Sequence, residues 1–336
     1  MTRTLAVVIP ILAACGGSAS STPAPEPPQA RVGSRAADRA TVPLHVEGNR
    51  PFVDIALRRA DGTTRNARFL VDSGGGGFLL TDQLARDLGL ARGETMHEGD
   101  TALARVTSPV VASIGDLPLE LTPDRVLVMV GKDDVLPAAA PGHADGVLPG
   151  HVLARYHVPG HADGVLPGHV LARYHVVFDY PGATFSIARA GALAPRGTPL
   201  PMPVSPGSGF PRTELVVDGA THGFLLDTGA SFTMVSQALL ERWGKAHSSW
   251  ERHAGAFGGA ATLGGQTLET MFVPDATWGG QALSRVGVTS QHVGVFEKWL
   301  SSMMTAPIEG SLAGNVLSQF RVDLDSPDQK LYLSRP

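Results

Sequence analysis

The sequence predicts an all-β protein with short helices, built as two homologous lobes, and three observations lead to this prediction. The chain consists largely of short apolar or alternating runs broken by Gly, Pro and Asp, which is the pattern of strands and tight turns. Residues 69–89 (FLVDSGGGGFLLTDQLARDLG) align without a gap to residues 224–244 (FLLDTGASFTMVSQALLERWG). Residues 163–189 align in the same way to residues 309–335. We therefore expect two copies of one unit of about 140 residues, related by a pseudo-twofold axis.

The first 15 residues, MTRTLAVVIPILAAC, resemble a bacterial lipoprotein signal peptide that ends in a lipobox. An apolar stretch follows Arg3, and the chain's single cysteine, Cys15, comes directly after Leu-Ala-Ala. This pattern predicts cleavage before Cys15, a lipid anchor on its side chain, and a location in the bacterial cell envelope facing the periplasm or the exterior. The alternative is an ordinary secretory signal with a chance cysteine, which also places the protein outside the cytoplasm.

The remaining chain divides by composition into a linker and two lobes. Residues 16–40 lack aromatic side chains and are rich in Pro, Ser, Ala and Gly, which is typical of an extended linker. We expect the N-terminal lobe at 41–193, a Pro-rich connection at 194–211, and the C-terminal lobe at 212–336. No later stretch reaches the roughly 18 apolar residues of a spanning helix, so membrane contact is expected only through the N-terminal lipid. Both lobes lie in one chain, and no oligomer is required.

Each lobe is expected to contain a hairpin turn and a short helix around its aligned motif. The Asp-Gly pairs at 61–62 and 218–219 lie between apolar runs and predict tight hairpin turns. Residues 81–90 and 236–243 have helical spacing, and each segment begins with a Thr or Ser of the capping type. Two short helices are therefore expected in an otherwise β-rich chain.

The second aligned segment contains a Gly-x-Leu-x-Gly core at 164–168 and again at 310–314, for which we expect a structural role beside the aspartates. An 18-residue block, PGHADGVLPGHVLARYHV, overlaps the first of these cores and occurs twice in tandem within 141–176. Identity that complete indicates a recent duplication or an assembly artefact, because structural repeats drift apart. The copy at 159–176 aligns to the second lobe and is expected to build the core. The copy at 141–158 is expected to loop out or to pack peripherally.

Both copies of the first motif end an apolar run with an aspartate, which needs a partner if it is buried. The repeated Asp-[Ser/Thr]-Gly, the following helix and the later Gly-x-Leu-x-Gly segment resemble single-chain, two-lobe aspartic proteases of the retropepsin-like and pepsin-like group. The resemblance covers essentially everything from residue 41 onward. It implies two acid-protease-type β-barrel lobes, a peptide or unfolded-protein substrate, and no metal or cofactor.

The resemblance also assigns site residues. It implies that water is activated between the catalytic pair Asp72 and Asp227. Two adjacent carboxylates suit this chemistry because they cannot both ionise easily and so share one proton, as is known for aspartic proteases. The charged carboxylate takes a proton from the water while the neutral one donates to the carbonyl oxygen. The residues implied to support the two loops are Ser73, Gly74, Thr228 and Gly229.

The first aspartate loop departs from the family pattern. After Gly74 the glycine run continues through 75–77, where the family has a side chain, so we expect the first lobe to hold its aspartate less firmly than the second. The Gly-rich segment 257–265 has two interpretations, a mobile flap over the cleft or a plain surface hairpin.

Composition and spacing argue against other classes of function. The net charge is only -4, with no block of like charge, which indicates neither nucleic acid nor an anionic membrane surface as a partner. The glycine run at 74–77 lacks the spacing and the β-α-β context of a dinucleotide-binding loop. The histidines between residues 143 and 175 lack metal-ligand spacing, and half of them are copied by the duplication. The remaining alternative is a catalytically silent envelope lipoprotein that binds peptides or partner proteins in the same interlobe cleft.

Overall fold

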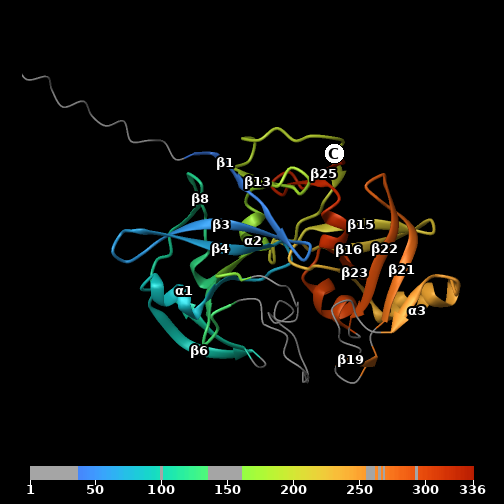
Figure 1. Ribbon diagram of the computed structural model, residues 1–336, viewed down its shortest axis with the longest axis horizontal. Helices are drawn as coiled ribbons and strands as arrows, with labels where there is room; N and C mark the ends of the chain where they lie inside the picture. The colour runs from blue at the N-terminus through green and yellow to red at the C-terminus, as the bar shows by residue number, and fades with distance from the viewer. Residues whose placement is uncertain are drawn as a thin grey trace, which may run out of the picture. The chain divides into compact units, whose positions relative to one another are not determined.

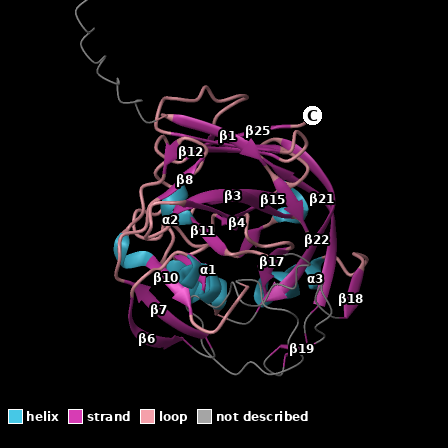
Figure 2. Cartoon of the chain, turned by 60° about the vertical axis from the view of Figure 1, so that its left-hand side comes forward, coloured by secondary structure: helices cyan, strands magenta, loops and turns pink. Residues whose placement is uncertain are grey.

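The computed structural model describes residues 37–98, 101–134, 161–254, 262–263, 266–267, 269–291 and 294–336. These residues are mostly strand, with a few short helices, as Figure 2 shows, and the prediction of an all-β protein with short helices is confirmed. Several predictions lie outside the described residues. They concern the signal peptide with Cys15, most of the linker, the copy of the duplicated block at 141–158, and most of the Gly-rich segment 257–265.

The first lobe is built on a ten-stranded sheet, whose long strands β3 and β4 are drawn in blue in Figure 1. Its strands are β2 (His45–Glu47), β3 (Arg50–Arg58), β4 (Thr64–Asp72), β5 (Phe78–Thr81), β6 (Arg92–Glu98), β7 (Thr101–Val106), β8 (Ala112–Ile114), β9 (Leu117–Pro118), β10 (Val126–Met129) and β11 (Gly164–Pro167). The order is β6-β7-β10-β5-β11-β4-β3-β8-β9, and β2 also pairs with β3. Its helices are α1 (Asp82–Asp87), the 3₁₀ turn η1 (Pro123–Arg125) and α2 (Gly168–Leu171).

The second lobe is a closed barrel. Its strands are β15 (Arg212–Val217), β16 (Ala220–Leu226), β17 (Thr233–Ser236), β18 (Arg252–Ala254), β21 (Glu269–Trp278), β22 (Gln281–Gln291) and β23 (Gly310–Leu312). The order is β15-β16-β23-β17-β22-β21-β18, and β15 closes the barrel by pairing with β21. The other elements are α3 (Gln237–Ala246), the π-helical turn η3 (Val295–Leu300), α4 (Gly314–Leu317) and the small pair β19 (Thr262–Leu263) and β20 (Gln266–Thr267).

A third sheet joins strands from both lobes. It consists of β1 (Arg39–Pro43), β12 (His175–Asp179), β13 (Thr184–Ala188), β14 (Leu200–Pro201), β24 (Arg321–Asp325) and β25 (Lys330–Ser334), in the order β1-β13-β12-β24-β25-β14. The central neighbours β12 and β24 come from the two aligned segments and run antiparallel, as a pseudo-twofold axis between them requires. Strand β1 begins at Arg39, within the last two residues of the segment that the sequence assigns to the linker.

The predicted turns and helix starts are found in the structure. Gly62 and Gly219 lie in turns with φ of 84° and 75°, a backbone conformation that glycine adopts without strain. The hydroxyl of Thr81 accepts from the amide of Leu84 at 3.1 Å at the start of α1. The hydroxyl of Ser236 accepts from the amide of Leu239 at 3.1 Å at the start of α3. Each helix is thus fixed at its N-terminus by the capping residue expected from the sequence.

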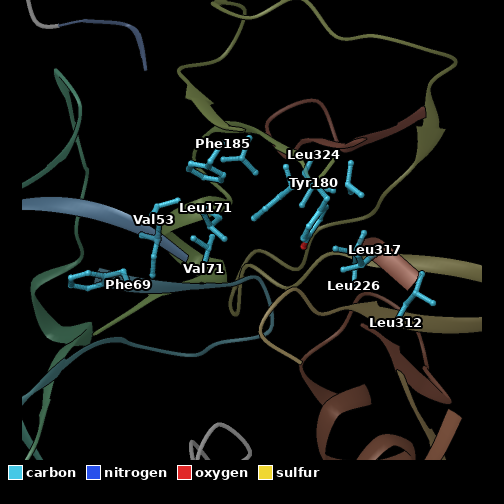
Figure 3. Close-up of a cluster of buried hydrophobic side chains, with 14 of the residues drawn as sticks. Val53, Phe69, Val71, Leu171, Tyr180, Phe185, Leu226, Leu312, Leu317 and Leu324 are labelled. Atoms are coloured by element: carbon cyan, nitrogen blue, oxygen red, sulfur yellow. The ribbon is translucent and has the colours of Figure 1, made fainter. Parts of the chain in front are cut away.

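One buried apolar cluster extends through both lobes and the sheet that joins them. Figure 3 shows part of it, with side chains such as Val71 from the first lobe, Leu226 from the second, and Tyr180 from the turn between β12 and β13. The second copy of the duplicated block contributes Leu166 to this cluster and Val165 to a smaller one, and the two residues are 0% and 1% exposed. This copy therefore lies in the core, where its alignment with the second lobe placed it.

Candidate active site

Each aspartate lies at the buried end of a strand, beside one of the Gly-x-Leu-x-Gly segments. Asp72 is the last residue of β4, and the parallel neighbour β11 pairs Pro167 with it. Asp227 directly follows β16, and its amide donates to the carbonyl oxygen of Leu312 in the parallel strand β23 at 2.9 Å. The two segments thus fix the backbone at each aspartate, which is the structural role expected for them.

The two aspartate loops are joined to each other by reciprocal hydrogen bonds. The amide of Ser73 donates to Oγ1 of Thr228 at 3.0 Å, and the amide of Thr228 donates to Oγ of Ser73 at 3.0 Å. Each hydroxyl then donates to a carbonyl of the opposite lobe, Ser73 to Leu226 at 2.6 Å and Thr228 to Val71 at 2.7 Å. All four bonds are buried, so the two loops are held as one unit across the lobe boundary.

The glycines of the two motifs allow the loops to approach closely. A Cβ atom on Gly229 would lie 2.2 Å from Cγ of Asp72, and a Cβ atom on Gly74 would lie 3.0 Å from Cγ of Asp227. Each aspartate therefore packs against the glycine that follows the other aspartate. At Gly229 any side chain would displace the opposite carboxyl group, so this position requires glycine.

The two carboxyl groups are buried together. Asp72 is 0% exposed and Asp227 is 8% exposed. The amide of Gly74 donates to Oδ1 of Asp72 at 2.9 Å, and the amide of Ala230 donates to Oδ1 of Asp227 at 3.0 Å. The two carboxyl groups are close enough for each to shift the protonation of the other. Two carboxyl groups in this position cannot both ionise easily, which favours one shared proton.

Burial changes the protonation of both groups. It raises the pKa of Asp72 well above its usual range, and the negative charge of Asp227 raises it further. Burial also raises the pKa of Asp227, to about 6, although the amides of Ala230 and Gly229 favour its charged form. Because the two groups titrate as a pair, the pair rather than one residue carries the proton. The site is a carboxyl dyad that keeps a proton at pH values where isolated aspartates have lost it.

The two loops differ after the shared motif. In the second lobe, Oδ1 of Asn315 accepts from the amide and the hydroxyl of Thr233, both at 2.8 Å, and so ties α4 to the end of the loop. The aligned residue in the first lobe is His169, which is buried. Burial and the charges of Arg125 and Arg173 lower the pKa of His169 to about 4.

Three residues near the site were missed by the sequence analysis. Arg50 and His169 are buried beside the first loop. Tyr180 is also buried, and burial together with the nearby charge of Asp227 raises the pKa of its hydroxyl. The ungapped alignment of 163–189 with 309–335 places His169 opposite Asn315, so this difference between the lobes was visible in the sequence. Arg50 and Tyr180 carry no comparable signal, because an isolated Arg or Tyr is ordinary in a sequence.

Among the described residues, no group of three or more His, Cys, Asp or Glu side chains is arranged to hold a metal ion. No helix in the described part of the chain is long and apolar enough to cross a membrane.

Solved structures similar to this one include the crystal structure of an aspartic proteinase from Irpex lacteus. The match has a TM-score of 0.50 and 13% sequence identity, and it covers 88% of this chain and 97% of the proteinase. The fold is that of a pepsin-like aspartic proteinase. No protein-family model matches the sequence, and no curated protein matches it. At this level of identity the likeness concerns the fold, and the case for an activity depends on the site itself.

Proposed function

We propose that the chain is an aspartic endopeptidase that hydrolyses peptide bonds with a water molecule activated between Asp72 and Asp227. The observation that carries this proposal is the buried carboxyl pair, whose two loops are held together by matching hydrogen bonds from both lobes. Peptide hydrolysis needs a base for the water and an acid for the carbonyl oxygen. A dyad with one proton supplies both groups at once.

In the proposed mechanism the ionised carboxyl takes a proton from the water as its oxygen attacks the peptide carbon. The protonated carboxyl donates to the carbonyl oxygen, which becomes a hydroxyl of the tetrahedral intermediate. The carboxyl that received a proton then delivers it to the leaving nitrogen as the C–N bond breaks. A hydroxyl of the intermediate returns its proton to the other carboxyl, so the dyad again holds one proton. The amides of Gly74 and Ala230 fix one oxygen of each carboxyl, so the other oxygens are available for the reaction.

Because burial raises the pKa of both aspartates, the singly protonated dyad should persist into mildly acidic solution. The test is incubation of the purified protein with an unfolded protein substrate at several acidic pH values, with and without a chelator. We expect cleavage that the chelator does not inhibit. Loss of cleavage in the chelator would instead indicate a metalloenzyme. Binding without cleavage would support the catalytically silent peptide-binding protein.

Substitution of the dyad gives the sharpest form of this test. Asp72→Asn and Asp227→Asn should each lower kcat/KM by about 10³-fold or more, and the double variant should be no worse than either, because the two groups act as one unit. Circular dichroism should show an intact fold in all three variants. Peptidase activity that survives both substitutions would sink the proposal.

The proposal includes attachment of the protein to a membrane of the bacterial cell envelope through Cys15. The support is the sequence alone, where an apolar run and a small-residue cleavage site precede the single cysteine. Cys15→Ser should release the protein into the soluble envelope fraction or block its processing. If the variant fractionates with membranes as the parent does, the anchor is not on this residue.

A further inference from the structure

A buried arginine lies at the start of the first lobe's central hairpin. Arg50 is the first residue of β3, and its side chain is 0% exposed. It follows the two-residue turn Gly48-Asn49, in which both residues have positive φ, and it pairs with Glu47 across that turn. A buried guanidinium is uncommon because an arginine always carries its charge in a protein. Its place in the fold therefore needs a physical reason.

The strand register places Arg50 opposite Asp72. Strands β3 and β4 pair Phe52 with Leu70, and two further steps along each strand lead to Arg50 and Asp72. Alternate residues of a strand share one face, so Arg50 lies on the face of Phe52, and Asp72 on the face of Leu70. Phe52 and Leu70 belong to one buried cluster, so these are the same face of the sheet. The arginine and the aspartate thus end adjacent strands on a shared, buried face.

The same hairpin reaches the second lobe. Nδ2 of Asn49 donates to the carbonyl oxygen of Ser231, four residues after Asp227, at 3.3 Å. A Cβ atom on Gly314 would lie 1.8 Å from the carbonyl oxygen of Asn49, so the hairpin packs directly on the start of α4. The backbone beside Arg50 is therefore held against the second aspartate loop and α4, while β3 runs beside β4, the strand that ends at Asp72.

The second lobe has no arginine at the matching place. There β15 and β16 pair Arg212 with Leu225, the counterpart of Leu70, so Phe210 corresponds to Arg50 and Pro211 to Pro51. Phe210 is packed in an apolar cluster with Leu225, Ala230 and Met234. The cation is thus present on one side of the pseudo-twofold axis only.

The charge of Arg50 acts on both carboxyl groups. Burial raises the pKa of Asp72 and of Asp227, and the positive charge of Arg50 opposes this rise at both residues. A cation near a carboxyl group commonly lowers its pKa by about 1 to 3 units.

Other titratable and charged groups stand near the hairpin and the loops. Glu47 and Arg68 pair with each other at 2.6 Å. Burial raises the pKa of Tyr180, and burial lowers that of His169, which leaves its ring neutral above about pH 4.

We propose that Arg50 is a positioning residue of the dyad, whose fixed positive charge sets the pH range over which the two aspartates hold a single proton. This inference rests on the proposed peptidase function for its consequence in catalysis. Without the cation, both apparent pKa values of the pair rise, and the active range moves toward neutral pH. With it, the dyad remains singly ionised in more acidic solution.

The test is the dependence of kcat/KM on pH for the full chain. In Arg50→Met both limbs of the profile should move to higher pH by about one unit or more. Arg50→Lys retains the charge and should keep both limbs near those of the parent. The matched control is Arg68→Met, which removes a cation from the same face of the same hairpin and should not move the profile. A folded Arg50→Met variant with the parent's profile would overturn the inference.

A second measurement separates this inference from the proposed function. Carboxyl ¹³C NMR of Asp-labelled protein, with Asp72→Asn and Asp227→Asn used for assignment, reports the titration of the dyad without any substrate. If the dyad titrates at higher pH in Arg50→Met but the parent cleaves no peptide, the inference stands and the peptidase proposal fails. If the parent cleaves peptides and the titration is unchanged, the inference fails alone. Arg50→Gln provides the neutral variant should the methionine variant not fold.

Discussion

The two aspartate loops, residues 72–77 and 227–232, exchange matching hydrogen bonds through Ser73 and Thr228 before the glycine of the motif and have different side chains after it. Up to that point Ser73 and Thr228 exchange equivalent bonds at equal distances of 3.0 Å. Beyond it the first loop has three more glycines, whereas the second has Ala230, Ser231 and Phe232. The part of the site where the lobes meet is symmetric, and the asymmetry begins where each loop returns into its own lobe.

The supports behind the loops differ as well. The second loop is followed by Thr233, which Asn315 holds through two hydrogen bonds, whereas the first loop has the buried His169 behind it. Arg50 on the first side corresponds to Phe210 on the second. A dyad must have two unlike members, one charged and one neutral, and unlike surroundings on the two sides are one way to produce this.

The largest effect on stability is expected from the matching hydrogen bonds that join the two loops. Ser73→Ala and Thr228→Ala should each lower the free energy of unfolding by about 2 kcal/mol, because each leaves a buried amide and a buried carbonyl without their partner. Denaturant unfolding measures the loss. Nearly equal losses would confirm that the two hydroxyls are equivalent.

The control for these two variants is Ser186→Ala, which removes a more exposed hydroxyl bonded to Thr41 in β1. Its effect should stay within about 0.5 kcal/mol. If Ser73→Ala is as mild as this control, the bonds between the loops do not stabilise the joined site.

His169 should make the free energy of unfolding depend on pH in acidic solution. Its counterpart Asn315 does not titrate and adds no such dependence in the second lobe. Burial lowers the pKa of His169 to about 4, so between that value and the unfolded value of about 6.5 the unfolded chain binds more protons. The free energy of unfolding should therefore fall as the pH falls through this window. In His169→Asn, which copies the second lobe, the fall should be smaller. His97→Asn, at an exposed position of β6, is the control and should keep the parent's slope.

His175, in the central sheet, should show the opposite dependence. Burial disfavours its charge, but the hydrogen bond and the charge of Asp323, together with Asp325, outweigh burial and raise the pKa of His175. A raised pKa contributes stability that is complete below the unfolded value of about 6.5 and is lost as the pH rises through the folded value.

Denaturant unfolding of His175→Gln should therefore show a smaller loss of stability from about pH 6 to pH 9 than the parent shows. His97→Gln, at an exposed position of β6, is the matched control. Equal slopes in His175→Gln and the parent would mean that the pair of His175 with Asp323 contributes nothing to joining β12 to β24.

The sequence predicted those parts of the fold that depend on short-range chemistry or on internal repetition. The caps at Thr81 and Ser236 are read from residue type and spacing, and the pairing of Asp72 with Asp227 follows from the ungapped alignment of two motifs. The alignment of 159–176 with the second lobe also predicted that the second copy of the duplicated block lies in the core. In each case the information lies within a few residues or in a direct match between two segments.

Other features depend on contacts that the sequence does not announce. The burial of Arg50 results from a strand register and from a hairpin that reaches the other lobe, and the partner of His175 is Asp323, 148 residues away. The start of β1 at Arg39 was missed because its partner strand β13 lies far along the chain, and the linker composition continues to that point. Such contacts are set by tertiary packing, which overrides local composition.

The smallest effect is expected from making the first loop resemble the second. Gly76 is the counterpart of Ser231. A Cβ atom added to Gly76 would have no neighbour within 4 Å, and the φ angle of Gly76 is not positive. Gly76→Ala should therefore raise the free energy of unfolding by about 0.4 to 1 kcal/mol, because alanine restricts the unfolded chain and causes no clash in the folded one.

Gly168→Ala is the contrasting variant. A Cβ atom at this position would lie 2.3 Å from the carbonyl oxygen of Ser73, so the substitution should destabilise the protein. Denaturant unfolding should thus give opposite signs for the two changes. If Gly76→Ala also destabilises the protein, the freedom of the glycine run is needed for the native loop, and the first loop is not simply a looser copy of the second.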